Sequence, residues 1–114
     1  MKLIGSKMER DFREELLKSS EALQDPESKL RQVLEDESHI TQNAYVLHWT
    51  SEQLEDLYTV LISGSYLVDV EIDKYDDSKS PKVKRNELKP YLHGLSKINQ
   101  VRLAVAQDLA CTKT

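Results

Sequence analysis

A chain of 114 residues is long enough for one domain with one hydrophobic core, and its composition excludes several classes of protein. Hydrophobic residues make up 39% and charged residues 32%, with few glycines and prolines, which is typical of a globular chain. The one cysteine, Cys111, cannot form an internal disulfide, so the sequence predicts a reducing compartment. No apolar run has the length of a membrane span, and the first residues turn polar too soon for a signal peptide. We therefore expect a single cytoplasmic domain over residues 1–114.

The net charge of −4 is unevenly distributed along the chain. Residues 1–80 carry nine Lys and Arg against eighteen Asp and Glu, which is −9, and residues 81–114 carry seven against two, which is +5. An acidic body binds phosphate backbones poorly, because nucleic-acid affinity depends on Lys and Arg displacing counterions. The charge suits a basic protein partner, although composition alone favours a role in solubility.

Two helices are predicted in the first third of the chain. Ser6 and Glu9 form a capping box, and apolar residues then recur at helical spacing, which predicts a helix from about 7 to 23. Asp25-Pro26 has the N-cap and first-turn residues of a second helix. That helix should end near the three acids at 35–37, because they oppose the negative end of its dipole. Its apolar stripe is Leu30, Val33 and Leu34.

The hydrophobic period then changes to that of β-strands. Residues 44–49 and 57–62 are rich in aromatic and β-branched side chains, and residues 65–73 alternate between apolar and polar. Ser63-Gly64 between the second and third strands is typical of a two-residue hairpin turn. The sequence therefore predicts three consecutive antiparallel strands.

The last third predicts a long helix that Asn86 caps and that ends near Ala110. Pro90 falls in its first turn, and Gly94 weakens it by about 1 kcal/mol relative to alanine. The predicted buried stripe is Leu88, Tyr91, Leu95, Ile98, Val101, Val105 and Leu109. The order α-α-β-β-β-α favours an α+β fold, a three-stranded antiparallel meander covered on one face by helices.

The hairpin register determines which side chains share the open face of this sheet. With a two-residue loop, one face pairs Val60 with Leu67, Tyr58 with Asp69 and Asp56 with Glu71. Apolar and aromatic groups ringed by carboxylates suit the docking of a basic partner. The predicted partner-binding residues are Tyr58, Val60, Leu67, Asp69, Glu71 and Asp73. Alternatively, these are ordinary exposed apolar residues, the last helix covers them, or a one-residue slip moves them to other faces.

Few residues point to catalysis. The histidines His39, His48 and His93 lack a metal-ligand spacing, the glycines stand alone, and the basic residues after 81 lack interleaved aromatic residues. The one catalytic candidate is Asp69-x-Glu71-x-Asp73-Lys74, whose carboxylates would share a face and could hold Mg²⁺. Metal-dependent nucleases of the restriction-endonuclease type carry a lysine where this chain has Asp73, and Lys74 would point to the opposite face. We therefore expect no enzyme activity, no cofactor, no metal and no nucleic-acid partner.

Two segments, Met1–Glu9 and Gly94–Ala106, together with the central hairpin, resemble small cytosolic bacterial proteins of the immunity type. Such proteins are encoded beside secreted polymorphic or contact-dependent toxins. The resemblance spans most of the chain and implies a stoichiometric inhibitor without a cofactor, which protects its own cell from a toxin domain. On this hypothesis the apolar residues of the predicted face are the anchor, and its carboxylates stand in for the substrate phosphates of a basic toxin such as a nuclease. The alternative from another class is an intracellular adaptor or regulator that forms a homodimer or binds another protein.

Overall fold

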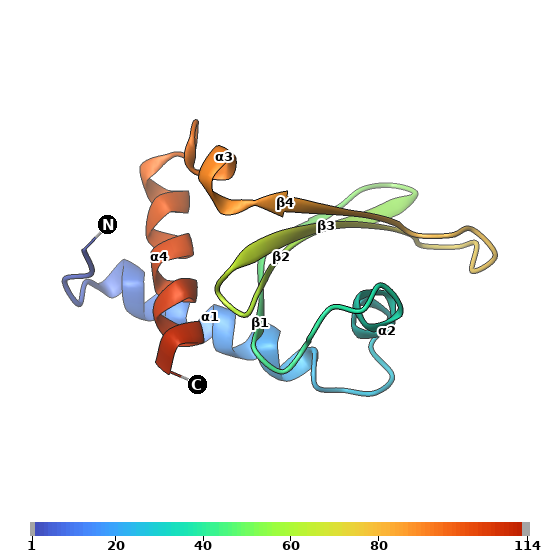
Figure 1. Cartoon of the computed structure of the whole chain (residues 1–114), viewed down its shortest axis with the longest axis horizontal. Coiled ribbons are helices and arrows are strands. Elements are labelled where there is room, and N and C mark those ends of the chain that lie inside the picture. Colours follow the sequence, from blue (N-terminus) through green and yellow to red (C-terminus); the bar gives the residue numbers. More distant parts are fainter. Residues whose placement is uncertain (1, 113–114) are drawn as a thin grey trace.

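The strands form one antiparallel meander in the order β1-β2-β3-β4, and helices precede and follow it (Figure 1). The structure is a computed structural model that describes residues 2–112. Its elements are α1 (Lys7–Ala22), α2 (Lys29–Asp36), β1 (Ala44–Ser51), β2 (Glu55–Ile62), β3 (Tyr66–Asp73), β4 (Lys82–Glu87), α3 (Leu88–Leu92) and α4 (Lys97–Thr112). The α+β class and the meander are confirmed, whereas the sheet has a fourth strand that the sequence did not predict.

The predicted capping box at the start of α1 is present. The Ser6 hydroxyl accepts a hydrogen bond from the backbone N–H of Glu9 at 3.2 Å. The Glu9 carboxylate in turn accepts from the backbone N–H groups of Ile4, at 3.0 Å, and Gly5, at 2.8 Å. These hydrogen bonds, with that from Ile4 as the main cause, hold the pKa of Glu9 below its ordinary value. The chain before α1 is thereby fixed to the first turn of the helix.

The predicted start of the second helix at Asp25-Pro26 is wrong, because α2 begins at Lys29. Its N-cap is Ser28, whose hydroxyl accepts from the backbone N–H of Arg31 at 3.2 Å. Asp25 instead accepts from the backbone N–H of Glu27, two residues on, at 2.9 Å. An Asp side chain that bonds its own backbone in this way closes a turn, so this segment links two helices instead of opening one.

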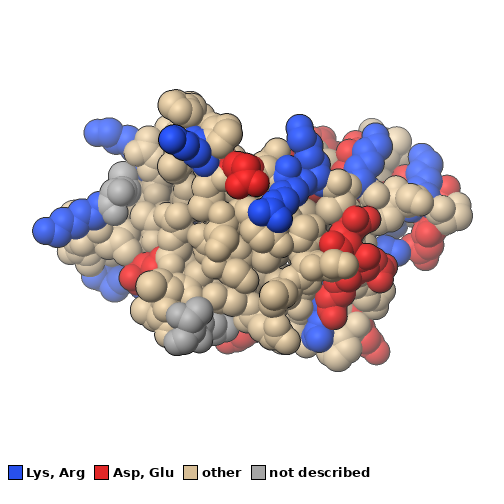
Figure 2. All heavy atoms as spheres, viewed as in Figure 1, with Lys and Arg blue, Asp and Glu red and all other residues tan. Residues whose placement is uncertain are grey.

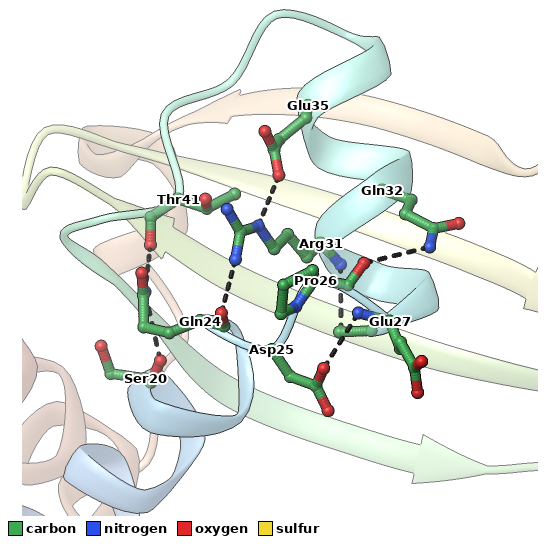
Figure 3. A network of polar contacts seen from close by, with 10 residues as sticks. Ser20, Gln24, Asp25, Pro26, Glu27, Arg31, Gln32, Glu35 and Thr41 are labelled. Carbon is green, nitrogen blue, oxygen red and sulfur yellow. Dashed lines mark hydrogen bonds and ion pairs between the residues drawn. The ribbon is translucent and has the colours of Figure 1, made fainter.

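Arg31 connects α2 to the end of α1 (Figure 3). Its guanidinium donates to the backbone carbonyl of Gln24 and pairs with the Glu35 carboxylate at 2.6 Å. The Gln24 amide donates to the carbonyl of Thr41 at 3.0 Å, which joins the segment before β1 to the same network. The position of α2 against the sheet therefore rests on polar contacts as well as on its buried residues Leu30, Val33 and Leu34.

The β2–β3 hairpin has a three-residue loop, Ser63–Ser65, and not the predicted two-residue turn. Ile62 pairs with Tyr66, so each residue of β2 opposes a residue one step further along β3 than predicted. Ser63 and Gly64 both adopt positive φ, 53° and 69°, and the Ser65 N–H donates to the carbonyl of Ile62. The register error moves the side chains of β3 to the opposite faces relative to those of β2.

Helices cover both faces of the sheet, which corrects the prediction of one covered face (Figure 1). We name the faces after the helices that pack on them. On the α4 face, α1 and α4 bury Tyr45, Leu47, Leu61 and Leu67. On the α2 face, the buried residues of α2 pack with Val60, Ile62, Val68, Val70 and Ile72.

The single long C-terminal helix is also a wrong prediction. Residues 82–87 form β4, which pairs with β3 and places Lys84 opposite Asp69. After the five-residue α3, Gly94 adopts φ +82°, a left-handed conformation that interrupts a helix. Helix α4 then begins at Lys97, and Ile98 of the predicted buried stripe is 54% exposed. No helix within residues 2–112 is long and apolar enough to cross a membrane.

Candidate protein-binding surface

The helices leave part of the α4 face uncovered, and this part forms a groove of about 540 Å³. Helices α1 and α4 pack on the end of this face that is nearest the β2–β3 hairpin, where the large apolar side chains lie. Toward the other ends of β2 and β3 the side chains become polar. The walls of the groove include Leu57, Thr59, Asp69, Glu71, Lys82 and Lys84. We call this surface the sheet groove.

Asp69 provides a fixed carboxylate in the sheet groove. One of its oxygens accepts a hydrogen bond from the hydroxyl of Thr59, its register partner, at 3.0 Å, and the other accepts from the side-chain amide of Asn86. Both donors are uncharged, so they orient the carboxylate without neutralising it. Its charge, together with burial as the larger cause, raises the pKa of the Tyr91 hydroxyl.

Glu71 lies next to Asp69 along the same face, and β4 places two lysines beside them. The Glu71 carboxylate lies 4.0 Å from the ammonium of Lys82, an exposed pair that contributes little to stability. Lys84 is the register partner of Asp69. Figure 2 shows basic side chains along β4 and acidic ones gathered over α2. The sheet groove therefore combines an acidic row on β3 with a basic row on β4.

The predicted set of partner-binding residues does not lie on one face. Val60 and Leu67 are both 0% exposed, and they belong to the cores of opposite faces. The expectation that they form an exposed apolar pair is therefore wrong, because the longer hairpin loop puts them on opposite faces and helices cover both faces there. Asp69 and Glu71 share the α4 face, whereas Tyr58 packs against the core of the α2 face.

Asp73, the third predicted carboxylate, is used within the β3–β4 loop. It accepts hydrogen bonds from the backbone N–H groups of Tyr75, at 2.9 Å, and Asp76, at 2.7 Å, and pairs with Lys79 at 3.5 Å. These backbone hydrogen bonds are the main cause that holds the pKa of Asp73 below its ordinary value. Asp73 thus stabilises the β3–β4 loop and does not line the sheet groove.

The indole of Trp49 forms an exposed aromatic surface on the α2 face. Its ring is stacked on that of Tyr58, with 6.2 Å between the centroids and 7° between the planes. A β-bulge in β1, between Val46 and His48, makes Trp49 and Tyr58 register partners. Without the extra residue Trp49 would oppose Leu57 and face the sheet groove. The bulge therefore determines the side of the sheet on which the one tryptophan stands.

His48 and Arg102 form a contact between β1 and α4. The Arg102 guanidinium donates to the carbonyl of Leu47 at 3.1 Å and lies 3.2 Å from Nδ1 of His48. Because a guanidinium only donates, Nδ1 must accept, which requires a neutral imidazole with its proton on Nε2. Burial, and then the charge of Arg102, lower the pKa of His48. The bond to Leu47 also occupies a backbone group on the outer edge of β1.

The carboxylates of β3 do not form a metal centre with neighbouring ligands. Among the residues that the structure describes, no three His, Cys, Asp or Glu side chains lie close enough together to hold a metal ion. Lys74 lies 3.8 Å from Asp56, whose register partner is Ile72, so it is on the α2 face as expected. Asp69 and Glu71 on the opposite face have Lys82 and Lys84 near them instead.

Sequence reasoning missed the stacked tryptophan and the fourth strand. The run Tyr45-Val46-Leu47 has consecutive apolar residues and no alternation, which indicates a strand buried on both faces and gives no sign of the bulge. The β4 segment, Lys82–Glu87, has one apolar residue, so nothing in its periodicity indicated a strand. Comparison with known proteins adds nothing to this surface, since no family model, curated protein or solved structure matches the chain.

Proposed function

We propose that this protein is an inhibitor of the immunity type, which binds a basic toxin domain through the sheet groove and blocks the active site of the toxin. The observation that carries this proposal is the carboxylate of Asp69, which stands in the uncovered part of the sheet and is oriented by the neutral donors Thr59 and Asn86. A preoriented carboxylate binds a cation without first having to be ordered, which favours association. Glu71 beside it supplies a second carboxylate.

The proposal predicts that a toxin domain is encoded beside the gene of this protein, and the test uses that domain. Expression of both in one cell should restore growth, and calorimetry with the purified pair should give a one-to-one complex. Replacing Asp69→Asn together with Glu71→Gln should weaken binding by at least about tenfold, or about 1.4 kcal/mol. The matched control is Asp36→Asn with Glu37→Gln, which removes the same charge from the exposed end of α2. Growth that is not restored, or equal affinities for the two double variants, would refute the proposal.

A second candidate function is favoured by the basic row on β4. Because Lys82 and Lys84 stand beside Asp69 and Glu71, two copies of the groove offer each other complementary charges. This arrangement favours a self-associating adaptor or regulator. Light scattering coupled to size-exclusion chromatography separates the candidates. A tight homodimer that is lost in the Asp69→Asn, Glu71→Gln variant would favour the adaptor, and a monomer the inhibitor.

A further inference from the structure

Trp49 stands at a second hollow, on the side of the sheet opposite to the sheet groove. The hollow measures about 330 Å³ and lies between the end of α1, the start of α2 and the bulged strand β1. Its apolar walls are Ala22, Leu23, Leu30, Val46, Trp49 and Tyr58. We call it the aromatic hollow. It differs from the sheet groove in charge, since its walls include one charged residue, Lys29, whereas those of the sheet groove include four, Asp69, Glu71, Lys82 and Lys84.

The exposed part of Trp49 is apolar. The side chain is 63% exposed, yet its single polar atom, the indole N–H, donates to the Asp56 carboxylate at 3.0 Å. One side of the ring contacts Tyr58, and the hydrogen bond fixes the orientation of the indole. A large aromatic ring that is already ordered loses little conformational freedom on binding, which is why tryptophan is common among the residues that dominate interfaces.

The charges at the rim of the aromatic hollow already have partners. Asp56 accepts from the indole and lies 3.8 Å from the ammonium of Lys74, and Lys29 lies 4.0 Å from the carboxylate of Asp77. A charged guest would have to compete with these pairs, whereas an uncharged one would leave them intact. The charge balance and the apolar walls therefore match an uncharged apolar guest.

A third hollow connects the aromatic hollow with the sheet groove around the outer edge of β1. It measures about 370 Å³, shares Val46 and Trp49 with the aromatic hollow, and shares His48 and Thr50 with the sheet groove. A single partner that contacts the C-terminal end of the edge strand β1 would thus reach both sides of the sheet. The bulge that turns Trp49 to the α2 face produces this arrangement.

We infer that the aromatic hollow binds an aliphatic side chain of an extended, uncharged segment of a protein partner, with Trp49 as the main contact. The inference deepens the proposed function and rests on it only for the existence of a protein partner. It replaces the apolar anchor expected at Val60 and Leu67, which are buried. Aromatic-lined grooves that accept extended proline-rich segments are a recurring mode of peptide recognition.

The test uses Trp49 as its own reporter, since it is the only tryptophan of the chain. The probe is a capped peptide of sequence Gly-Pro-Leu-Pro-Gly-Pro-Leu-Pro-Gly, and the matched probes carry serine or lysine in place of both leucines. The leucine peptide should change the emission of Trp49 saturably, with a dissociation constant below about 1 mM, the weak end of specific binding. The serine and lysine peptides should bind about tenfold more weakly or worse, because they lose the apolar burial.

Two variants locate the binding to the hollow. Ala22→Arg places a long side chain in the aromatic hollow from an exposed position on α1 and should abolish the response. Glu21→Arg, at the adjacent exposed position, should leave it unchanged, and circular dichroism confirms that both variants fold. An equal response to all three peptides, no saturable response, or equal effects of the two variants would each overturn the inference. An emission that shifts only with protein concentration would assign the hollow to a second copy, which also overturns it.

The outcomes separate this inference from the proposed function. Binding of the leucine peptide without rescue from the toxin would leave the aromatic hollow as a binding site and remove the inhibitor function. Rescue that Asp69→Asn, Glu71→Gln abolishes, combined with no peptide response, would leave the inhibitor function and remove the apolar anchor.

Discussion

Truncation of Leu67 tests whether helices cover both faces of the sheet at the hairpin end, on which the description of both surfaces depends. In the register predicted from the sequence, Leu67 is an exposed anchor, and its truncation affects binding only. In the structure it is 0% exposed and packs in the core between the sheet and α4. Leu67→Ala removes three carbon groups, worth about 2.4 kcal/mol at about 0.8 kcal/mol for each buried methylene. The cavity left behind adds to this transfer free energy, so we expect a loss of about 3–4 kcal/mol in the free energy of unfolding.

Urea denaturation followed by circular dichroism measures this loss as a lower midpoint at unchanged slope. In a thermal melt, the same change should lower the midpoint by roughly 12 °C or more for a domain of this size. The matched control is Leu54→Ala, the same truncation at a side chain that is 60% exposed, which should stay within about 0.5 kcal/mol of the parent. A loss below about 1 kcal/mol for Leu67→Ala would refute the burial of Leu67 under α4, because surface truncations have effects of that size.

Two further predictions concern the C-terminal turn and the contact between β1 and α4. Gly94→Ala should destabilise the protein by about 1 kcal/mol in urea denaturation because φ there is +82°, whereas in a continuous helix it would stabilise by a similar amount. The free energy of unfolding should fall as the pH is lowered from 7 to 5, because the lowered pKa of His48 means that the unfolded chain binds a proton that the folded chain does not. In His48→Gln, which keeps an acceptor for Arg102, this pH slope should be smaller, and an equal slope would contradict the assignment.

The parts of the fold that the sequence predicted are those specified by local patterns. The capping box defined the start of α1 because Ser6 and Glu9 bond within one turn. The alternation in residues 66–73 predicted β3 correctly. Toward the end of that strand, carboxylates on the uncovered side alternate with buried apolar residues on the other side. In both cases the decisive interactions lie within a few residues of each other, where periodicity and spacing describe them well.

The parts that failed depend on contacts distant in the sequence. Strand β4 forms because β3 offers it a hydrogen-bonding edge, and at an exposed edge charged residues such as Lys82 and Lys84 are tolerated without apolar alternation. A third loop residue, Ser65, sets the register, and the close approach of Gly64 to Ala110 of α4 shows that the hairpin packs against a helix far along the chain. Neither contact leaves a local pattern in the sequence.

The two candidate surfaces have a common physical origin in how far the helices extend over the sheet. At the hairpin end, the consecutive residues Leu67 and Val68 are both 0% exposed, which is possible only where helices cover both faces of the strand. Two and four residues further along, Asp69 and Glu71 occupy positions equivalent to that of Leu67 on the α4 face, which α1 and α4 no longer cover. A partner that contacts the groove there also meets the C-terminal end of the edge strand β1. At that end the bulge has turned the indole of Trp49 to the other face. Polar and apolar contacts are thus separated onto opposite sides of one strand, and a partner must reach around its edge to use both.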